Sequence, residues 1–428
     1  MKAVLLVAGE GKRLAPITNT RPKHIIPIAG KPLLQQTIES IVRYARIRDF
    51  LLVVGYKKEK IMEVFGNGED LGVHIEYIEQ QQFLGTANAA NYARDFVEDE
   101  PFLLMYGDLL ADPVIFEDLI SFYDEHPADA IITLREVDDP SNFGIIQLDD
   151  QNAVVQIVEK PAPEMNLGNL ANAGIYILSS KIFDAIDRTP ISPRGEYELT
   201  SSLQILIDDG APVLGFNVGT KFWSDVGHCW QLLEASQHYM DEFFQPEVRG
   251  TIEKYVVMDG PVHVGEGTLI RAGTYIEGPV YIGKNCRIGP GAYLRPYTCL
   301  SDGCIVGNSS EIKASILLAG ASVPHLSYVG DSVIGEGVNF GAGTKTANLK
   351  LDDSNVKMVV KGDRVDTGRR KLGAVVGDLT KIGINTSIMP GTTIGEHCQL
   401  GAGLILHGDI PPNSRLIKKE NYDVEQTT

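Results

Sequence analysis

The stretch VGEGTLIRAGTYIEGPVYIGKNCRIGPGAYLRPYTCLSDGCIVGNSSEI, residues 264–312, repeats with a period of six. Each sixth position holds a branched aliphatic residue without a slip: Val264, Ile270, Ile276, Ile282, Ile288, Leu294, Leu300, Val306 and Ile312. A second uninterrupted run has the same period of six and contains Val376, Ile382, Ile388, Ile394, Leu400 and Leu406. This period is typical of a left-handed parallel β-helix, in which each sixth side chain points into a triangular prism. We therefore predict a β-helix over residues 251–415.

Two stretches interrupt the period. Residues 316–329 leave the phase, and residues 350–375 form a longer polar excursion that contains Lys357 and Lys361. Excursions from a solenoid usually lie on one binding face. We expect these two segments to carry function. The charged residues 416–428 are predicted to be a frayed tail.

Residues 1–230 have a different pattern of apolar residues, without the period of six. Apolar runs at residues 2–8, 50–55, 102–106 and 130–134 read as strands, and the amphipathic stretches 33–44 and 86–96 read as helices. Such alternation predicts an α/β domain of Rossmann-like type with a mostly parallel sheet. Residues 231–244 have helical spacing and end before Pro246, which predicts a linker helix within residues 231–250.

A glycine turn follows the first predicted strand. Gly9 and Gly11 allow backbone N–H groups to approach a phosphate, and Arg13 and Lys23 add two cations. The turn is not a dinucleotide-binding motif, because Leu14 stands where the third glycine belongs, and it is not a P-loop. The pattern suits a nucleoside triphosphate.

Other polar residues follow strands at the same predicted sheet edge, where ligands of parallel sheets bind. Gln80 offers an amide for the imino and carbonyl edge of a pyrimidine, and Gly85 allows backbone approach, although Thr86 could also be a simple helix cap. Asp108 and Asp225 each follow an apolar run and could share Mg²⁺, which takes few protein ligands.

A region of shorter strands carries residues suited to a sugar phosphate. The carboxylate and amide among them can bond hydroxyl groups, and the lysine can hold the phosphate. Each is weak evidence alone, since a Glu-Lys-Pro tripeptide is ordinarily a solvated turn. The candidates are Gly144, Glu159, Lys160, Asn172 and Glu196.

The composition limits the possible partners. The chain has 428 residues and a formal net charge of −18, which argues against a general binder of nucleic acid or anionic membranes. Five cysteines form no C-x-x-C pair, which favours reduced, structural thiols. The N-terminus lacks the pattern of a signal peptide, so we expect a cytoplasmic protein.

Together, the motifs in residues 1–230 resemble those of sugar-1-phosphate nucleotidylyltransferases. The resemblance implies that Ala8, Gly9, Gly11, Gln80, Gly85 and Thr86 bind UTP or dTTP, with Arg13 and Lys23 catalytic. It implies Mg²⁺ on Asp108 and Asp225, and a sugar phosphate on the five candidates above. One departure is Leu109-Leu110 after the first aspartate, where many relatives have Asn or x-Pro. It leaves the nucleotide and the sugar open.

The β-helix half contains, in order, Leu294-Arg295-Pro296, Glu311-Ile312-Lys313, His325 to Asp331 and Val338 to Gly343. With the N-terminal motifs, this order resembles the archaeal type of bifunctional glucosamine-1-phosphate acetyltransferase/uridylyltransferases over nearly the whole chain. The resemblance implies acetyl-CoA as a co-substrate, His325 as general base, and a homotrimer or a dimer of trimers. It implies a substrate site made of Arg295, Lys313, Tyr328, Asn339, Asn348 and Lys357, in which Lys357 or Lys361 comes from a neighbouring subunit.

Two other functions fit parts of the sequence. The chain could be a glucose-1-phosphate thymidylyltransferase or uridylyltransferase that uses the β-helix only as a trimer scaffold. It could also be a protein-binding subunit of the initiation-factor exchange type, which shares both domain types but needs no intact phosphate loop. The retained glycines, cations and aspartates favour an enzyme.

Overall fold

The computed structural model describes residues 1–165 and 167–419. The chain forms two compact units: one contains residues 1–10 and 32–225, the other residues 11–31 and 226–428. The division falls inside the predicted phosphate loop, between Glu10 and Gly11. The end of the predicted tail, residues 420–428, lies outside the described part of the chain.

The first unit is built on a mixed sheet in the order β10-β9-β11-β6-β1-β4-β5, in which β8 also pairs with β11, and β12 pairs with β8. Strands β6, β1, β4 and β5 are parallel, as are β8 and β12, whereas β11, β9 and β10 introduce antiparallel pairs. The predicted parallel sheet is therefore confirmed for its first strands. The bounds are β1 Lys2–Val7, β4 Asp49–Val54, β5 His74–Glu79, β6 Phe102–Tyr106, β8 Ala130–Glu136, β9 Gly144–Leu148, β10 Val154–Glu159, β11 Leu170–Leu178 and β12 Val213–Asn217.

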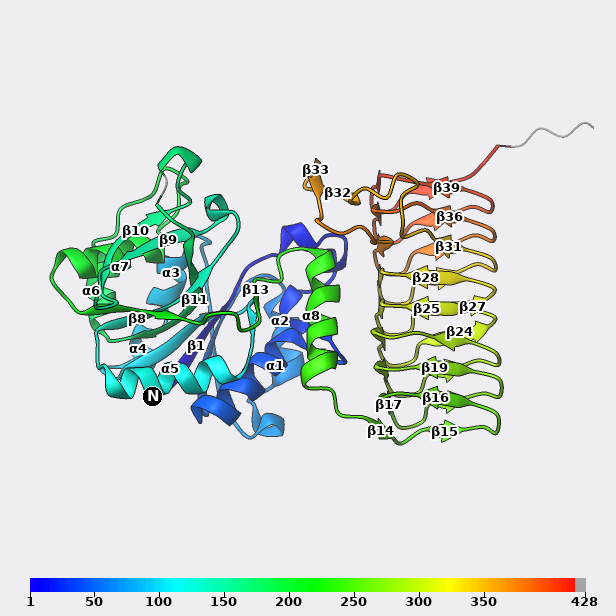
Figure 1. The fold of residues 1–428 in the computed structure, drawn as a ribbon, viewed down its shortest axis with the longest axis horizontal. Helices are drawn as coiled ribbons and strands as arrows, with labels where there is room; N and C mark the ends of the chain where they lie inside the picture. Colours follow the sequence, from blue (N-terminus) through cyan, green and yellow to red (C-terminus); the bar gives the residue numbers. More distant parts are fainter. Residues whose placement is uncertain (166, 420–428) are drawn as a thin grey trace, which may run out of the picture. The chain divides into compact units, whose positions relative to one another are not determined.

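Helices cover this sheet (Figure 1). Alanines of α3 and apolar residues of α6 and α7 pack with alternate strand residues such as Val4, Leu104 and Ile132. The intervening residues, for example Leu5 and Met105, are also fully buried, so both faces are covered. The helices are α1 Leu33–Ser40, which continues as a π-helical turn Ile41–Ala45, α2 Lys58–Phe65, α3 Thr86–Asn91, α4 Arg94–Val97, α5 Val114–Glu125, α6 Lys181–Asp187 and α7 Leu199–Asp208.

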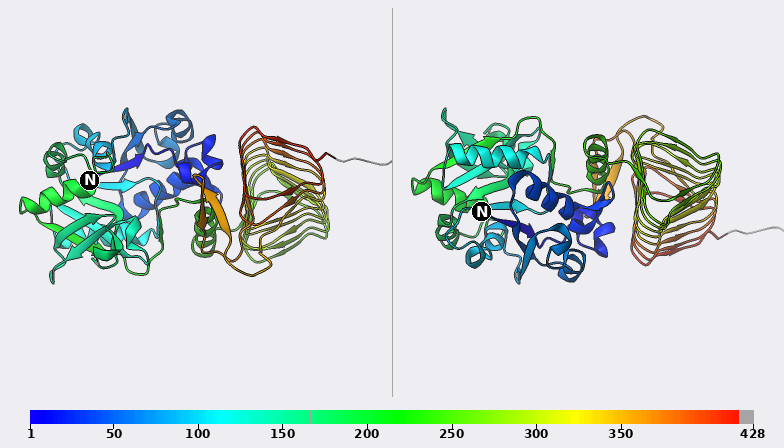
Figure 2. Two further views of the ribbon diagram at one scale, coloured as in Figure 1. Left: turned by 90° about the horizontal axis from the view of Figure 1, so that it is seen from above. Right: turned by 90° about the horizontal axis from the view of Figure 1, so that it is seen from below.

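The second unit contains the predicted β-helix. Its strands form three parallel sheets of nine, nine and eight strands, in which each strand pairs with its counterpart in the next coil (Figure 1). Figure 2 looks along the stack, where the coils overlie one another as a prism. All the in-phase aliphatic residues named above are at most 4% exposed. The predicted interior is confirmed.

The strands of the first sheet are β14 Glu247–Val248, β17 Val262–Val264, β20 Val280–Ile282, β23 Thr298–Leu300, β26 Ile316–Leu317, β29 Val333–Ile334, β34 Ala374–Val376, β37 Thr392–Ile394 and β40 Asp409–Ile410. Those of the second are β15 Thr251–Ile252, β18 Leu269–Ile270, β21 Arg287–Ile288, β24 Ile305–Asn308, β27 Ser322–His325, β30 Asn339–Phe340, β35 Lys381–Ile382, β38 Gln399–Leu400 and β41 Arg415–Leu416. Those of the third are β16 Val257–Asp259, β19 Tyr275–Glu277, β22 Tyr293–Leu294, β25 Glu311–Lys313, β28 Tyr328–Gly330, β31 Lys345–Thr346, β36 Ser387–Ile388 and β39 Ile405–Leu406.

The first predicted interruption is not an excursion. Ile276 lies beside Leu294 in the next coil, and the spacing between these two partners is three full periods of six. Ile312 lies beside Val329, and Leu317 lies beside Ile334. The partners in each of these pairs are one residue closer in sequence than Ile276 and Leu294. The stack thus continues through residues 316–329 with shorter coils, and the sequence period slips without a break in pairing.

The second interruption does leave the stack. After Leu349, which bridges to Lys371, the chain forms a hairpin of β32 Lys357–Val360 and β33 Asp363–Asp366. The unit also contains α8, Cys229–Glu242, and residues 11–31, which form three 3₁₀ turns and β2 Pro27–Ile28. Within the described residues, no helix is long and apolar enough to cross a membrane. All five cysteines are buried and free, as predicted.

The β-helix interior should dominate the stability of the second unit. Ile312 is fully buried, whereas Ile305 is 36% exposed. We expect Ile312→Ala to lower the free energy of unfolding by about 2–5 kcal/mol, because it removes buried methyl groups and leaves a cavity. Ile305→Ala should cost less than about 1 kcal/mol. Denaturant unfolding followed by circular dichroism measures both changes, and equal losses would contradict the assigned interior.

Candidate functional site

The carboxyl ends of four parallel strands form one edge of the first unit's sheet. Ala8 and Gly9 follow β1, Gln80 follows β5, and Asp108 follows β6 after one glycine. The Ala8 carbonyl accepts from Tyr56 N–H at 3.0 Å, and Gln80 N–H donates to Val54 O at 2.8 Å, so the backbone there stays tied to the sheet. A Cβ on Gly9 would meet no atom within 4 Å. This edge is open beside Gly9.

The residues predicted at the base, Gln80 and Gly85, also make contacts within the protein. The Gln80 side chain is buried and donates to Asn88 Oδ1 at 3.0 Å. Gly85 has φ +110°, and a Cβ there would lie 2.5 Å from the Tyr197 carbonyl oxygen. The glycine is thus required by a backbone contact within the protein, whatever else approaches it.

Thr86 is not the N-cap of α3, because Gly85 holds that position and no side chain caps it. The Thr86 hydroxyl instead accepts from the Leu199 N–H at 2.9 Å, at the start of α7. It therefore satisfies a terminal donor of a different helix.

A short ribbon relates the two proposed metal ligands. Strands β7, Leu110–Ala111, and β13, Trp223–Ser224, pair antiparallel with Ser224 opposite Leu110. Asp225 follows β13 directly, and Asp108 is separated from β7 only by Leu109, so both carboxylates stand at the same end of the ribbon. At the other end of the ribbon, the Trp223 indole donates to Ala173 O at 2.8 Å.

These two aspartates fit a hard cation with few protein ligands. Among the described residues, no group of three or more His, Cys, Asp or Glu side chains could hold a metal ion. A two-carboxylate site is consistent with that finding, since Mg²⁺ usually takes one or two carboxylates together with substrate phosphates.

The sugar-phosphate candidates gather around β9, β10 and β11. A Cβ on Gly144 would lie 3.0 Å from Glu159 Oε2 and 3.8 Å from Asn172 Cβ. Glu159 accepts from the Thr200 hydroxyl at 3.1 Å, and Asn172 donates to Tyr176 OH at 2.7 Å. The structure thus brings Gly144, Glu159 and Asn172 together, while the Lys160 side chain is exposed.

Sequence reasoning missed Arg194. Its guanidinium lies 3.3 Å from Glu159, 3.6 Å from Glu196 and 3.3 Å from Glu198. Burial raises the pKa of Glu198, and Arg194 opposes that shift. The run Arg194-Gly195-Glu196-Tyr197-Glu198 was the available signal, because it places one cation among several acids.

Two buried tyrosines extend this region. Tyr176 OH donates to Tyr106 OH at 3.0 Å. Burial raises the pKa of both phenols well above the usual value for tyrosine, so both remain protonated donors at neutral pH. Through the Tyr176 hydroxyl, this pair orients the Asn172 amide.

The remaining phosphate-loop residues belong to the second unit. Gly11 has φ +65°, and a Cβ there would lie 3.3 Å from Thr18 and 3.4 Å from Lys23. The buried Lys23 side chain therefore packs across the glycine turn. The Arg13 guanidinium lies over Gly227, where a Cβ would come within 3.0 Å.

Arg13 also lines a cavity of about 200 Å³, together with Lys12, Asn19, Lys361 and Asp409. Lys361 reaches it from the hairpin tip. The excursion was expected to serve the acetyl-transfer site, so its position beside Arg13 is a finding that the sequence did not suggest.

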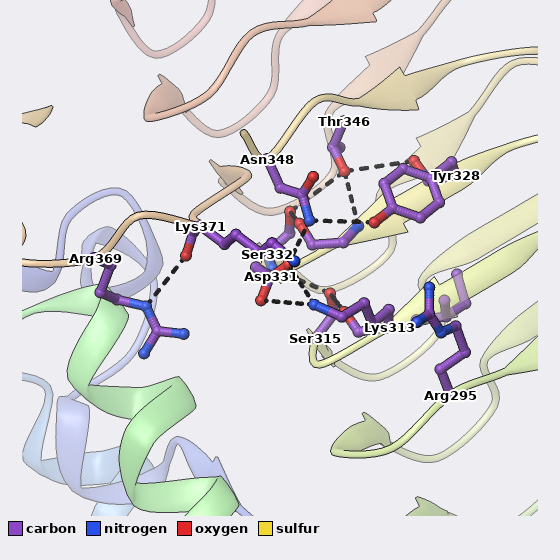
Figure 3. A network of polar contacts seen from close by, with 12 residues as sticks. Arg295, Lys313, Ser315, Tyr328, Asp331, Ser332, Thr346, Asn348, Arg369 and Lys371 are labelled. Carbon is purple, nitrogen blue, oxygen red and sulfur yellow. Dashed lines mark hydrogen bonds and ion pairs between the residues drawn. The ribbon is translucent and has the colours of Figure 1, made fainter. Parts of the chain in front are cut away.

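The β-helix candidates form a polar network on the third sheet (Figure 3). Lys313 Nζ contacts Asp331 at 3.0 and 3.2 Å, and Asn348 Nδ2 donates to the same carboxylate and to Tyr328 OH at 3.1 Å. Arg295 is one coil away and pairs with Glu311 at 2.9 Å. Four predicted residues are thus brought together by the stacking of successive coils.

Asp331 was not predicted as a site residue. It is 4% exposed and has φ +49°, at the corner after β28. Its carboxylate joins Lys313 to Asn348. An acid directly after the apolar Val329-Gly330 was the signal in the sequence.

Three predicted residues lie outside this network. His325 ends β27, next to the corner that leads to Tyr328, and its imidazole is exposed with no hydrogen bond to the described residues. Asn339 is exposed on β30, and Lys357 is exposed at the start of the hairpin. One chain alone does not bring Asn339 and Lys357 to the Lys313 network.

Three parts of the chain match known protein families. Residues 2–242 match the nucleotidyl transferase family. Residues 276–372 match the GMPPB C-terminal domain, and residues 373–408 match six bacterial transferase hexapeptide repeats.

Relatives match over nearly the full length. The bifunctional protein GlmU of Methanocaldococcus jannaschii is 44% identical over 98% of both chains. The chain belongs to the bifunctional GlmU family. A family member named bifunctional sugar-1-phosphate nucleotidylyltransferase/acetyltransferase, from Sulfurisphaera tokodaii, is 40% identical over 96% of this chain and 98% of its own.

A solved structure supports the N-terminal fold of this family member. A UDP-glucose pyrophosphorylase complexed with UDP-glucose is similar with a TM-score of 0.51 and 26% identity, over 56% of this chain and 98% of that chain.

The buried Asp331 should stabilise the β-helix of this GlmU-family chain. We expect Asp331→Ala to lower the free energy of unfolding by about 1–3 kcal/mol, because the amide of Asn348 and the ammonium of Lys313 lose their acceptor. Asp353→Ala is a matched control, since Asp353 pairs with Arg370 at 2.7 Å on the surface. That change should cost about 0–1 kcal/mol. Similar losses in thermal or denaturant unfolding would show that Asp331 does not hold the network.

Proposed function

We propose that the chain is a bifunctional enzyme that acetylates glucosamine-1-phosphate and then transfers a uridylyl group to the acetylated product. The β-helix transfers acetyl from acetyl-CoA to the sugar amine. The N-terminal half transfers uridylyl from UTP to N-acetylglucosamine-1-phosphate and releases pyrophosphate. The observation that carries this proposal is identity of 44% over 98% of both chains with a bifunctional GlmU protein, because it covers both sites at once. A cytoplasmic location is part of this proposal.

For uridylyl transfer, we assign triphosphate binding to Ala8, Gly9, Gly11, Arg13 and Lys23. Gln80, Gly85 and Thr86 lie where the base would bind. The sugar phosphate would contact Gly144, Glu159, Lys160, Asn172 and Glu196. Its phosphate oxygen attacks the α-phosphorus in line, the bond to the β-phosphate oxygen breaks, and no protein nucleophile is needed. Arg13 and Lys23 neutralise charge that develops on the leaving pyrophosphate.

Asp108 and Asp225 would hold Mg²⁺, which when bound supplies Lewis-acid polarisation of the phosphates. Their place at one end of the β7–β13 ribbon supports this assignment. Two carboxyl groups at one sheet edge would oppose the binding of an anionic donor, and a bound cation would offset that repulsion.

For acetyl transfer, we assign His325 as general base. The amine nitrogen attacks the thioester carbonyl carbon, a proton passes from nitrogen to the imidazole, and coenzyme A leaves as the thiol after reprotonation. An exposed, unbonded imidazole is free to accept that proton. A placed base contributes roughly 10²- to 10⁴-fold in rate.

Arg295 and Lys313 would bind the sugar phosphate in this reaction, and Tyr328 and Asn348 would orient the sugar. Asn339 and Lys357 lie apart from them in one chain, so we propose that a neighbouring subunit completes the site in a trimer or a dimer of trimers. Hexapeptide repeats support an oligomer of this kind.

A second candidate is a uridylyl- or thymidylyltransferase for glucose-1-phosphate with an inert β-helix. The similarity to a UDP-glucose pyrophosphorylase favours it, because that structure covers only the N-terminal part of this chain. The identity of 44% over 98% of both chains with a bifunctional protein GlmU argues against this candidate, because that match includes the β-helix.

Two single variants should separate the two activities. We expect His325→Ala to abolish coenzyme A release from acetyl-CoA and glucosamine-1-phosphate, while pyrophosphate release from UTP and N-acetylglucosamine-1-phosphate stays at the wild-type rate. Asp225→Ala should do the opposite, because it removes a proposed metal ligand. The assay follows thiol and pyrophosphate separately. Loss of both signals in either variant would contradict two independent sites.

Chelation should act on one activity only. We expect EDTA to abolish pyrophosphate release and added Mg²⁺ to restore it, whereas coenzyme A release should be unchanged, since acetyl transfer as proposed uses only side chains. Inhibition of both reactions by EDTA would contradict the assigned roles. The matched control is EDTA saturated with Mg²⁺.

A further inference from the structure

A buried ion pair ties residues 11–31 to the β-helix. Arg21 is 9% exposed and Asp378 is 5% exposed. Arg21 Nη2 donates to Asp378 Oδ2 and lies 3.1 Å from Glu336 Oε2. The Thr20 hydroxyl donates to the same Asp378 oxygen at 2.5 Å. Arg21 stands two residues before Lys23, so this contact fixes the segment that carries the proposed triphosphate cations.

The acids come from one corner of three successive coils. Ile334, Val376 and Ile394 stack in register in the first sheet, and Glu336, Asp378 and Glu396 each follow them by two residues. Glu396 accepts from Asn19 Nδ2 at 2.9 Å. Consecutive residues 19–21 therefore each donate to an acid of this corner. We call Glu336, Asp378 and Glu396 the acidic corner.

The coil itself does not require this ion pair. Asp378 Oδ1 accepts from the Glu336 N–H at 2.8 Å, which closes the corner. Asp302 makes the same bond to the Lys284 N–H at 2.7 Å at an equivalent corner, and it is exposed. One oxygen is thus enough for the turn, and in Asp378 the second oxygen faces Arg21 and Thr20.

The other end of the segment is fixed locally. The Thr18 hydroxyl donates to Gly11 O at 2.9 Å, and Lys23 packs across Gly11. The glycine turn, Thr18 and Lys23 thus move as one piece, and Arg21 anchors that piece. A displacement at residues 19–21 would be passed to both Lys23 and Arg13.

We propose that the acidic corner, through Asp378 and Arg21, positions the phosphate loop for uridylyl transfer. The β-helix then serves both reactions: its third sheet carries the acetyl-transfer network, and its first sheet holds the cations of the other site. Asp378 and Arg21 are positioning residues that touch no substrate. This inference depends on the proposed uridylyl transfer.

The test is Asp378→Asn in the full chain. Asparagine keeps an oxygen for the Glu336 N–H but presents N–H donors to Arg21 and Thr20. We expect KM for UTP to rise because the cations that bind the triphosphate are displaced. We expect kcat/KM for UTP to fall on the order of 10- to 100-fold, because misplacement of about an ångström at a reacting site costs up to about that much in rate. The rate of coenzyme A release should be unchanged. Adding Arg21→Gln should recover part of the loss, since an amide oxygen can then face the asparagine amide.

Asp302→Asn is the matched control, and it should leave both activities and the KM for UTP as in the wild type. A wild-type KM for UTP in Asp378→Asn would overturn the inference. So would an equal fall of both activities at constant KM, which indicates only a loss of folded protein. A wild-type chain that releases no pyrophosphate would instead overturn the proposed uridylyl transfer, and this inference with it.

Discussion

Parallel pairing between successive coils is the constraint on which the second unit depends. The in-phase aliphatic residues of successive coils lie in the interior, each beside its counterpart in the next coil. Side chains that are distant in sequence therefore meet without any dedicated loop. The Lys313–Asp331 contact and the acidic corner both arise in this way, on two different sheets.

The first unit builds its site by a different rule. Parallel strands bring the residues that follow them to one sheet edge, so Gly9, Gln80 and Asp108 share that edge although they are far apart in sequence. The sugar-phosphate candidates come instead from antiparallel strands, and the β7–β13 ribbon brings Asp225 back to Asp108. Regular backbone pairing thus places the groups for phosphate, metal and sugar.

Several predicted residues have structural roles that sequence reasoning assigned differently. Gly85 is required by the Tyr197 backbone, and Thr86 satisfies the first N–H of α7. The apparent interruption at residues 316–329 is a slight shortening of the coil. These differences share a cause, since a local pattern does not reveal which distant backbone lies against a residue.

The sequence by itself determined the β-helix, its interior and the sheet edge of the first unit, because hydrophobic period and strand–helix alternation are local properties. It also singled out Arg13, Lys23, Asp108 and Asp225 by residue type and position. Only the tertiary structure decided that Asp331 links Lys313 to Asn348, that Arg194 lies among three glutamates, and that Asp378 holds Arg21. Those roles depend on which charges the fold brings together, and that is fixed by how distant segments pack rather than by neighbours along the chain.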